Sequence, residues 1–482
     1  MRHYDLCVIG TGPAGQRAAI QASKLGKKVC VIERKAVVGG AALNTGTIPS
    51  KSLREAILHV TAAQRQGAYS DSFAPASLTA PGASAGDERA GRIQYLTRFT
   101  QQVVTAEVDV ATRHLVSNGI AIYQGDGAFV DANTVAVTDI DQATTTINAD
   151  YIVVAVGANP SRPANIPFDN ATIVDSDALL KLASLPKSLI VVGGGVIGTE
   201  YASMMQALGV RVTLIEGRPR LLEFLDAEIS EALQYHLRQA GMTLRLGEKV
   251  VKIQSVDAAP DAPTRKIAQA TLESGKTITA DCLLFCIGRQ GATDGLALDK
   301  VRLSADDRGR IKVNEHYQTD VPNIYAVGDV IGFPALASTS MEQGRLAACH
   351  MFGVKAESVP SLFPFGIYSI PEISMVGWTE EALTKEAVPF EAGVAQYKEI
   401  ARAQLMGDTT GMLKLLIHQE SRAILGVHVI GAGATELIHI GQAVMTYKGT
   451  VDYFINAVFN YPTLAECYKT AALNGANKLK NV

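Results

Sequence analysis

Cysteine is scarce in this sequence, which limits the chemistry that the chain can perform. Six cysteines in 482 residues are too few for a disulfide-stabilised scaffold. No Cys-x-x-Cys pair occurs, and no histidine pair stands nearby at ligand spacing, so we expect no metal site. Four of the cysteines lie in apolar, strand-like runs, where a buried and inert thiol is expected: Cys7, Cys30, Cys282 and Cys286.

An excess of either charge is also lacking, and so are long apolar runs. The chain has 44 Lys and Arg against 47 Asp and Glu, with no basic run, so we expect neither nucleic acid nor an anionic membrane as a partner. No apolar run approaches the roughly 18–20 residues of a membrane span. The first strand begins near Tyr4 and leaves no room for a signal sequence. These absences predict a soluble, cytoplasmic protein.

The composition itself is that of a folded protein of several domains. Hydrophobic residues make up 47% of the chain and charged residues 19%, which excludes a disordered or coiled-coil protein. A length of 482 residues predicts about three domains.

The strongest internal signal is a repeated unit of strand, glycine loop, helix, second strand and terminal carboxylate. The first copy consists of Leu6–Ile9, the loop Gly10-Thr11-Gly12-Pro13-Ala14-Gly15, a helix that stops at Gly26, and a strand that ends on Glu33. The second copy consists of Leu189–Val192, the loop Gly193-Gly194-Gly195-Val196-Ile197-Gly198, a helix that stops at Gly209, and a strand that ends on Glu216. In both copies the acidic residue follows the first glycine by 23 residues.

This unit is typical of dinucleotide binding. Glycines let backbone amides approach a pyrophosphate at the positive end of a helix, and the carboxylate accepts hydrogen bonds from ribose hydroxyls. A lone loop of this kind can be an ordinary helix–strand turn, but two full matches in one register argue against that reading. Each unit closes with an Asp, a six-residue apolar run and a glycine, at Asp150–Gly157 and Asp281–Gly288. We therefore expect an α/β fold with two Rossmann-like lobes, and two adjacent dinucleotides indicate hydride or electron transfer.

These motifs resemble those of the two-dinucleotide flavoprotein disulfide reductase family along essentially the full length. The resemblance implies that the first lobe binds FAD, that the second binds NAD(P)H, and that a C-terminal α+β domain forms a homodimer. The domains implied are residues 1–157 for FAD with a flexible insertion at about 70–92, residues 158–288 for NAD(P), residues 289–358 as a segment that returns to the FAD site, and residues 359–482 for dimerisation.

The resemblance also assigns cofactor-binding residues in each lobe. Those implied for FAD are Gly10, Gly12, Pro13, Ala14, Gly15, Glu33, Arg34, Gly40, Thr45, Lys51, Ala128, Gly157, Gly328, Asp329, Leu336 and Ala337. Those implied for NAD(P) are Gly193, Gly195, Val196, Ile197, Glu216, Arg218, Arg220, Val251 and Gly288.

Two departures from the family remove its thiol chemistry. The family carries two redox cysteines before a Pro-Ser-Lys sequence, and this chain has Ala42 and Thr47 in their places, ahead of Pro49-Ser50-Lys51. Neither side chain can form a disulfide. The family's His-Pro-Thr ending is Tyr461-Pro462-Thr463 here, and a tyrosine is a poor general base at neutral pH.

The remaining machinery resembles that of the Si-face-specific transhydrogenase branch of this family. The resemblance implies hydride transfer from NADPH to FAD and on to NAD⁺ in a reversible ping-pong reaction, with Lys51 and Glu200 paired near the flavin. It also implies that Tyr461 and Glu466 reach the flavin of a partner chain. Two alternatives stay open: an NAD(P)H:quinone or dye reductase or oxidase of the same fold, and a flavin-bound redox sensor.

Nucleotide preference is open as well. Glu216 suits the ribose diol of NAD(H) and repels a 2′-phosphate, whereas Arg218 and Arg220 can hold that phosphate. A carboxylate with two arginines suits a site that accepts both nucleotides, although the arginines can also be a solvated loop.

Overall fold

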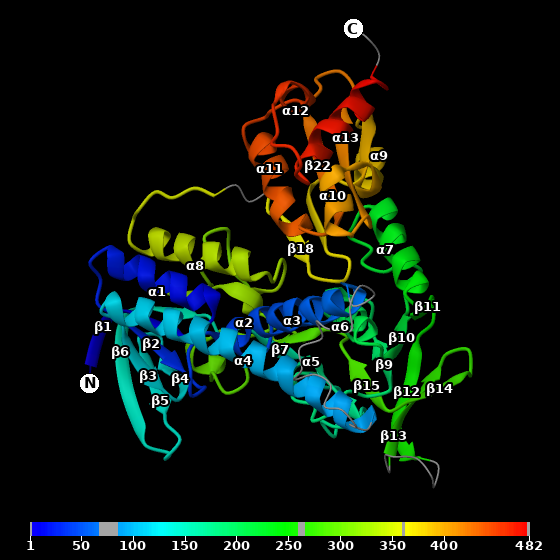
Figure 1. Ribbon diagram of the computed structural model, residues 1–482. Helices are drawn as coiled ribbons and strands as arrows, with labels where there is room; N and C mark the ends of the chain where they lie inside the picture. Colours follow the sequence, from blue (N-terminus) through cyan, green and yellow to red (C-terminus); the bar gives the residue numbers. More distant parts are fainter. Residues whose placement is uncertain (1, 67–84, 259–265, 359–361, 480–482) are drawn as a thin grey trace. The chain divides into compact units, whose positions relative to one another are not determined.

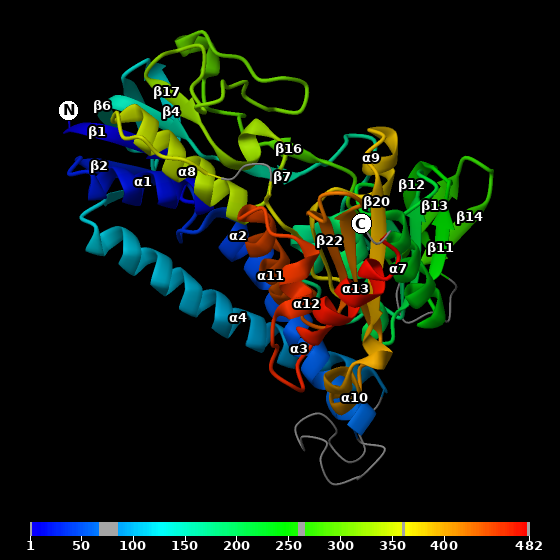
Figure 2. The same cartoon turned by 90° about the horizontal axis from the view of Figure 1, so that it is seen from above.

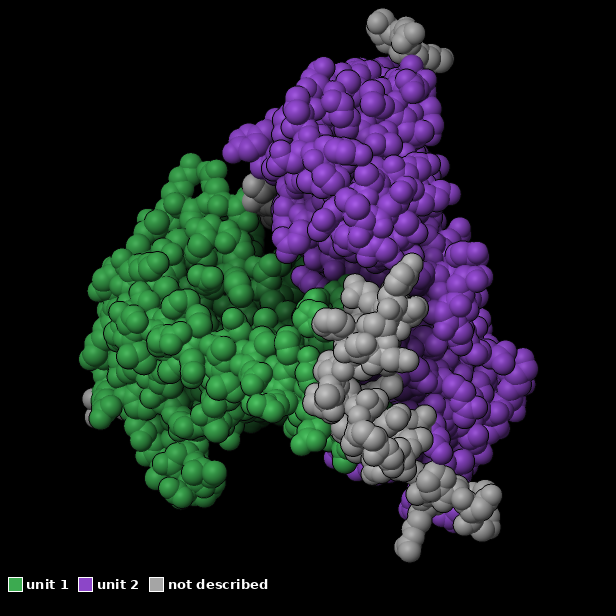
Figure 3. Space-filling model, viewed as in Figure 1, with its two compact units in different colours: residues 1–163, 175–185, 287–358 green, residues 164–174, 186–286, 359–482 purple. Residues whose placement is uncertain are grey.

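The computed structural model describes residues 2–66, 85–258, 266–358 and 362–479. Its contacts divide the chain into two compact units, coloured separately in Figure 3. Unit 1 contains residues 1–163, 175–185 and 287–358, and unit 2 contains residues 164–174, 186–286 and 359–482. The four-part division expected from the sequence stays a prediction. Within the described ranges, no helix is both long and apolar enough to cross a membrane.

Unit 1 is built on a seven-stranded sheet with a parallel core, which lies near the label N in Figure 1. Its parallel strands are β1 (Arg2–Ile9), β2 (Val29–Glu33), β3 (Ala121–Gln124), β6 (Thr144–Val154) and β17 (Ile324–Ala326). The first part of β6 also pairs in antiparallel fashion with β5 (Thr134–Thr138). Strand β5 in turn pairs in antiparallel fashion with β4 (Asp126–Asp131). The buried apolar strands of the first repeat therefore lie at the centre of the sheet, as the sequence predicts.

Two helices that are far apart in the sequence cover one face of this sheet together. Helix α1 (Pro13–Lys24) lies beside α8 (Ala337–Met351), as Figures 1 and 2 both show. They approach so closely at Gly344 that an added Cβ atom would overlap the carbonyl oxygen of Ala14. This contact holds the returning segment against the first glycine loop.

The remaining elements of unit 1 are short, except for two helices. They are α2 (Gly40–Asn44), α3 (Thr47–Gln66), α4 (Ala85–Ser117), α5 (Ser176–Leu179), the 3-10 turns Leu298–Val301 and Gly328–Ile331, and the paired strands β7 (Ala158–Pro160) and β16 (Arg289–Gly291). The sequence predicts a surface insertion at about 70–92. Part of that insertion lies outside the described residues, and from Ala85 onward the chain is helical instead.

The first half of unit 2 repeats the nucleotide-binding architecture. A parallel sheet has the order β11 (Thr243–Leu246), β10 (Arg211–Glu216), β9 (Ser188–Val192), β15 (Cys282–Phe285) and β8 (Ile173–Val174). Helices α6 (Val196–Ala207) and α7 (Ala227–Gln239) connect its strands, and β12 (Val250–Asp257), β13 (Lys266–Leu272) and β14 (Thr277–Ala280) form an antiparallel sheet beside it. Both sequence repeats thus fold as predicted.

The second half of unit 2 is a five-stranded antiparallel sheet with helices. The strand order is β18 (Phe365–Ile367), β19 (Ile373–Gly377), β22 (Ile424–Gly431), β21 (Gly411–His418) and β20 (Phe390–Gln396). The helices are α9 (Glu380–Lys385), α10 (Ala401–Met406), α11 (Ala434–Thr446), α12 (Val451–Asn456) and α13 (Glu466–Ala476), with a 3-10 turn at Tyr397–Glu399. This α+β part agrees with the fold expected for the C-terminal domain.

Candidate dinucleotide sites

The three glycines of the first loop have three different physical roles. Gly10 has a φ of +102°, which makes the tight turn after β1. An added Cβ atom at Gly15 would overlap the carbonyl oxygen of Gly10, so this glycine allows α1 to pack closely on the strand. At Gly12 the nearest neighbour of such an atom would be the Cα of Gly40 at 4.0 Å. The backbone at Gly12 is therefore open, as a pyrophosphate at the start of α1 requires.

The second loop repeats this division of roles. Gly193 has a φ of +111°, and an added Cβ atom at Gly198 would overlap the carbonyl oxygen of Gly193. Gly195 has an ordinary φ of −75°, and an added Cβ atom there meets no atom within 4 Å. Neither the turn nor the packing requires a glycine at this position, so the open space at the start of α6 fits a bound dinucleotide.

Each repeat carries its carboxylate back to its own glycine loop. Glu33 is buried, and its Oε2 accepts hydrogen bonds from the backbone N–H of Thr11 (3.2 Å) and from the Thr11 hydroxyl. Glu216 is buried and accepts from the backbone N–H of Gly194 at 2.6 Å. Both carboxylates thus lie where the ribose next to a pyrophosphate is expected.

Glu216 also forms a two-pronged ion pair with Arg218. The guanidinium Nε and Nη2 donate to the two carboxylate oxygens, each at 3.0 Å. Burial by itself raises the pKa of the Glu216 carboxyl, but hydrogen bonds from Arg218 and Gly194 lower it by more, so the pKa lies below its usual range. The group is therefore an anion, and Arg218 is paired with it.

The returning segment brings further residues implied for FAD to the first loop. An added Cβ atom at Gly328 would lie 3.1 Å from the Cβ of Ala14, which places Gly328 and Asp329 at the start of α1. Gly40 approaches Gly12 from the other side. The remaining residues implied for FAD also belong to unit 1: Pro13, Arg34, Thr45, Lys51, Ala128, Gly157, Leu336 and Ala337.

The residues implied for NAD(P) all belong to unit 2, with one exception. Val196 and Ile197 begin α6, and Val251 lies in β12 with 59% of its surface exposed. Gly288 instead belongs to unit 1, where its φ of +84° precedes β16.

Sequence reasoning missed Arg289, which the fold brings to Asp329, one of the residues implied for FAD. Its Nη2 donates to the carbonyl oxygen of Ala158, and its Nε lies 3.7 Å from Oδ2 of Asp329. The buried Nε has no hydrogen-bond partner within the described ranges. A cation with a free N–H beside Asp329 can bind an anionic group of a cofactor. Its position directly after Gly288 was the only available signal.

Asp177 adds an unusual carboxyl to the same unit. Burial, together with the charge of Asp175, raises its pKa, while Arg289 and a hydrogen bond with Thr45 lower it by less. Thr45 is one of the residues implied for FAD, so the fold couples that position to α5.

The four residues implied for catalysis lie in different parts of the chain. Lys51 is in unit 1, on α3, and Glu200 is in unit 2, on α6, where its carboxylate accepts from the backbone N–H of Tyr368 at 2.8 Å. Tyr461 is 75% exposed, and Glu466 at the start of α13 accepts from the backbone N–H of Thr463 at 3.3 Å. The pairing of Lys51 with Glu200 stays a prediction.

No thiol is available where the family performs disulfide exchange. Ala42 lies in α2 and Thr47 begins α3. The six cysteines are all free, and five of them are buried. Burial raises the pKa of the Cys282, Cys286 and Cys467 thiols to about 12, so they are protonated at neutral pH.

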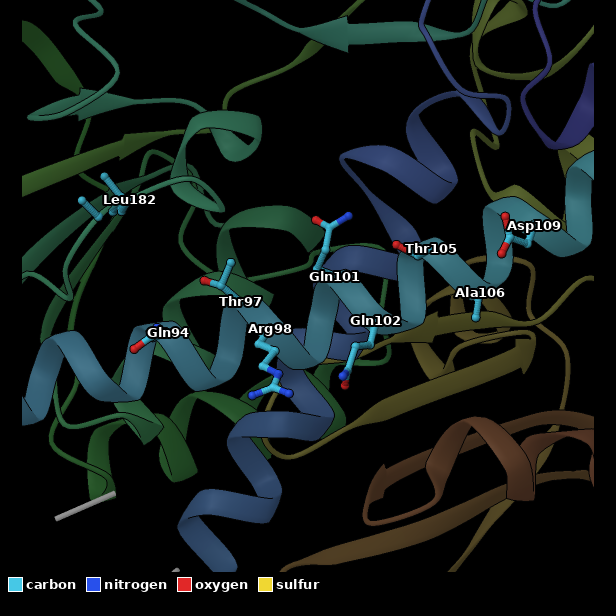
Figure 4. A pocket seen from close by; sticks show the side chains of 10 residues that line it. Gln94, Thr97, Arg98, Gln101, Gln102, Thr105, Ala106, Asp109 and Leu182 are labelled. Carbon is cyan, nitrogen blue, oxygen red and sulfur yellow. The ribbon is translucent and has the colours of Figure 1, made fainter. Parts of the chain in front are cut away.

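A cavity of about 1020 Å³ lies in unit 1. It is bordered by one face of α4, from Gln94 to Asp109, and by Leu182 and Ala183 (Figure 4). None of the residues implied for a cofactor borders it, and its polar lining is mostly neutral amides and hydroxyls. Among the residues that the structure describes, no cluster of His, Cys, Asp or Glu can hold a metal ion.

Comparison with known proteins places this architecture in a family. Residues 4–344 match the model of the pyridine nucleotide-disulphide oxidoreductases, and residues 363–472 match the dimerisation domain of the same family. The chain belongs to the pyridine nucleotide-disulphide oxidoreductase family, whose members bind FAD and use NAD(P)H. The family and the α/β fold expected from the sequence are confirmed.

Three curated relatives are similar along nearly the whole chain. Proteins named soluble pyridine nucleotide transhydrogenase are 49% identical in Mycobacterium bovis, 46% in a Marinomonas species and 45% in Yersinia enterocolitica, and at least 98% of each chain is covered. Among solved structures, LpdA from Mycobacterium tuberculosis has a TM-score of 0.86 at 25% identity, covering 98% of this chain and 99% of LpdA. The flavoprotein disulfide reductase RclA from Escherichia coli has a TM-score of 0.83 at 26% identity, with the same coverage.

Proposed function

We propose that this protein is an FAD-dependent NAD(P)⁺ transhydrogenase of Si-face specificity. It carries hydride reversibly between NADPH and NAD⁺ through FAD, without a disulfide intermediate. The observation that carries the proposal is two complete dinucleotide loops in a chain with Ala42 and Thr47 at the family's redox positions. The names of relatives at 45–49% identity support it.

The residues divide the work between binding and charge stabilisation. Bound FAD would accept hydride from one nicotinamide and return it to another. The N-termini of α1 and α6 each face an open glycine and hold a pyrophosphate. Glu33 and Glu216 accept hydrogen bonds from ribose hydroxyls. Lys51 would stabilise negative charge that develops beside it during hydride transfer.

The acceptor is tested directly by stopped-flow absorption. We expect NADPH to bleach the flavin spectrum of the purified holoenzyme, and NAD⁺ or thio-NAD⁺ to restore it within the turnover time. Reoxidation by a quinone but not by NAD⁺ would assign a dye or quinone reductase instead. A flavin that no acceptor reoxidises at a useful rate would indicate a redox sensor.

Removal of the two arginines near Glu216 is expected to separate the nucleotides. Arg218→Ala together with Arg220→Ala removes the cations available to a 2′-phosphate, so the KM for NADPH should rise roughly 10-fold or more while the KM for NADH changes little. Initial rates with each nucleotide measure this. The matched control is Arg422→Ala, which removes a partly exposed arginine of unit 2 that pairs with Asp452 at 2.6 Å. Equal effects of the double substitution on both KM values would refute the role.

The assembly and location belong to the same proposal. The match of residues 363–472 to a dimerisation domain supports a homodimer. In that dimer Tyr461 and Glu466 of each chain lie near the flavin of its partner, and the exposed ring of Tyr461 fits such an intermolecular contact. We place the protein in the cytoplasm, with nucleotides rather than nucleic acids or membranes as its ligands.

A further inference from the structure

Glu381 belongs to the second half of unit 2 but contacts the nucleotide-binding half. It lies on α9, yet its Oε1 accepts a hydrogen bond from the backbone N–H of Ala227, the first residue of α7, at 2.9 Å. The same oxygen lies 3.4 Å from Nη1 of Arg220. Both contacts are within unit 2, where α7 and α9 are labelled in Figure 1.

A buried ionic cluster holds Glu381 in this place. Asp226 accepts from the backbone N–H of Glu228 in α7 at 3.2 Å and from the backbone N–H of Glu380 in α9 at 3.1 Å. The ammonium of Lys414, which is 1% exposed, lies 2.8 Å from Asp226 and 2.7 Å from Glu380. The beginnings of α7 and α9 are thereby tied together, which keeps the backbone of Glu381 beside the start of α7.

Each arginine of the candidate 2′-phosphate site therefore faces a carboxylate. Arg218 is paired with Glu216, and Arg220 faces Glu381. Arg220 engages this carboxylate through Nη1 alone, while its buried Nε has no hydrogen-bond partner within the described ranges. An arginine with unused N–H donors can bind a phosphate, but a carboxylate 3.4 Å away offsets part of its positive charge.

We propose that Glu381 is a specificity-determining residue, whose negative charge lowers the affinity of the second lobe for nucleotides that carry a 2′-phosphate. The inference rests on the proposed function, because a ping-pong transhydrogenase has to release NADP(H) and NAD(H) from one site at comparable rates. Without Glu381, Arg220 would have no counter-charge and would hold NADP(H) too tightly for that exchange. Glu381 weakens the attraction for the 2′-phosphate and leaves unchanged the binding of the part that NAD(H) and NADP(H) share.

The test is the binding of two fragments to the holoenzyme, in which FAD fills the first lobe. Adenosine 2′,5′-bisphosphate carries the 2′-phosphate, and ADP does not. Glu381→Gln keeps an oxygen that accepts from Ala227 and Arg220 but removes the charge. At low salt, isothermal titration should show adenosine 2′,5′-bisphosphate binding about three- to tenfold tighter than to the unaltered protein, with ADP binding unchanged. The gain should shrink as salt is added.

Asp452→Asn is the matched control. Asp452 is 45% exposed, as Glu381 is, and belongs to unit 2, but it pairs with Arg422 rather than with Arg220. This control should change neither affinity. If Glu381→Gln leaves the affinity for adenosine 2′,5′-bisphosphate unchanged or weakens it, the proposal is overturned. Weaker binding in Glu381→Ala combined with no change in Glu381→Gln also overturns it, because Glu381 would then orient Arg220 instead.

The result is separable from the proposed function. Fragment binding does not depend on hydride transfer, so a holoenzyme that fails to reduce NAD⁺ can still show the expected change in affinity. Conversely, normal transhydrogenation with no change in Glu381→Gln refutes only the role of Glu381.

Discussion

Lys414→Met is expected to lower the free energy of unfolding of unit 2 by about 3–5 kcal/mol. The Lys414 ammonium is 1% exposed and lies within 2.9 Å of oxygens from Asp226, Glu228 and Glu380. Asp226 is also 1% exposed, so methionine leaves a buried carboxylate without its cation. The loss of a partner for a buried charge costs far more than the loss of an exposed ion pair.

The effect should depend on pH in one direction. Burial by itself raises the pKa of the Asp226 carboxyl, but His428 and Lys414 lower it by more, so its pKa in the folded chain is below the usual value. A depressed carboxyl stabilises the fold above its unfolded pKa of about 3.9, and that contribution disappears as the pH falls further. Removing Lys414 raises the pKa of Asp226 in the folded variant, because burial then acts without that cation. The difference between Lys414→Met and the unaltered protein should therefore shrink as the pH falls, since protonation of Asp226 removes the unpaired buried charge.

Thermal and denaturant unfolding of the holoenzyme measure this difference. The control is Lys276→Met, because Lys276 is 64% exposed and lies 3.8 Å from Glu248 in the same unit. That surface pair is expected to contribute less than about 1 kcal/mol. A Lys414→Met protein as stable as Lys276→Met would show that the buried cluster does not stabilise unit 2.

The nucleotide loops could be predicted from the sequence because their requirements are local. A glycine at Gly10 or Gly193 is set by a positive φ, and a glycine at Gly15 or Gly198 by contact with its own loop. Their spacing to the carboxylate at the end of the next strand is a property of one strand–helix–strand unit. Such constraints act within about 25 residues and are visible as a repeat.

The parts that were not predicted depend on contacts between distant segments. Lys414 and Asp226 are 188 residues apart, and the sequence of β21 does not show which distant carboxylates its lysine meets. Arg289 donates to Ala158, 131 residues earlier, so its place beside Asp329 follows only from the fold. Helix α4 was missed from Ala85 onward because its first residues follow a stretch rich in Ala, Ser, Pro and Gly, whose composition favours a loop.

Gly12 and Gly195 occupy equivalent positions in the two loops, which allows binding of FAD and of NAD(P) to be abolished separately. An added Cβ atom at Gly195 meets no protein atom within 4 Å, and at Gly12 only the Cα of Gly40 at 4.0 Å. Both residues have extended, negative-φ backbones that a valine can adopt, with φ of −75° and −64°. Their side-chain space is therefore available to a ligand rather than required by the fold.

Gly195→Val is expected to lower kcat/KM for both NADPH and NADH by roughly 100-fold, because its side chain displaces a pyrophosphate from the start of α6. The protein should still purify with FAD, and dithionite should still reduce its flavin. Gly12→Val should show the reverse pattern, with flavin lost during purification and the second lobe still able to bind ADP. Absorption spectra, stopped-flow reduction and fragment titration distinguish the two variants. Normal flavin reduction by low concentrations of NADPH in Gly195→Val would disprove the assignment of this loop to the nucleotide. A pyrophosphate bound at this loop could not share the space that the valine fills.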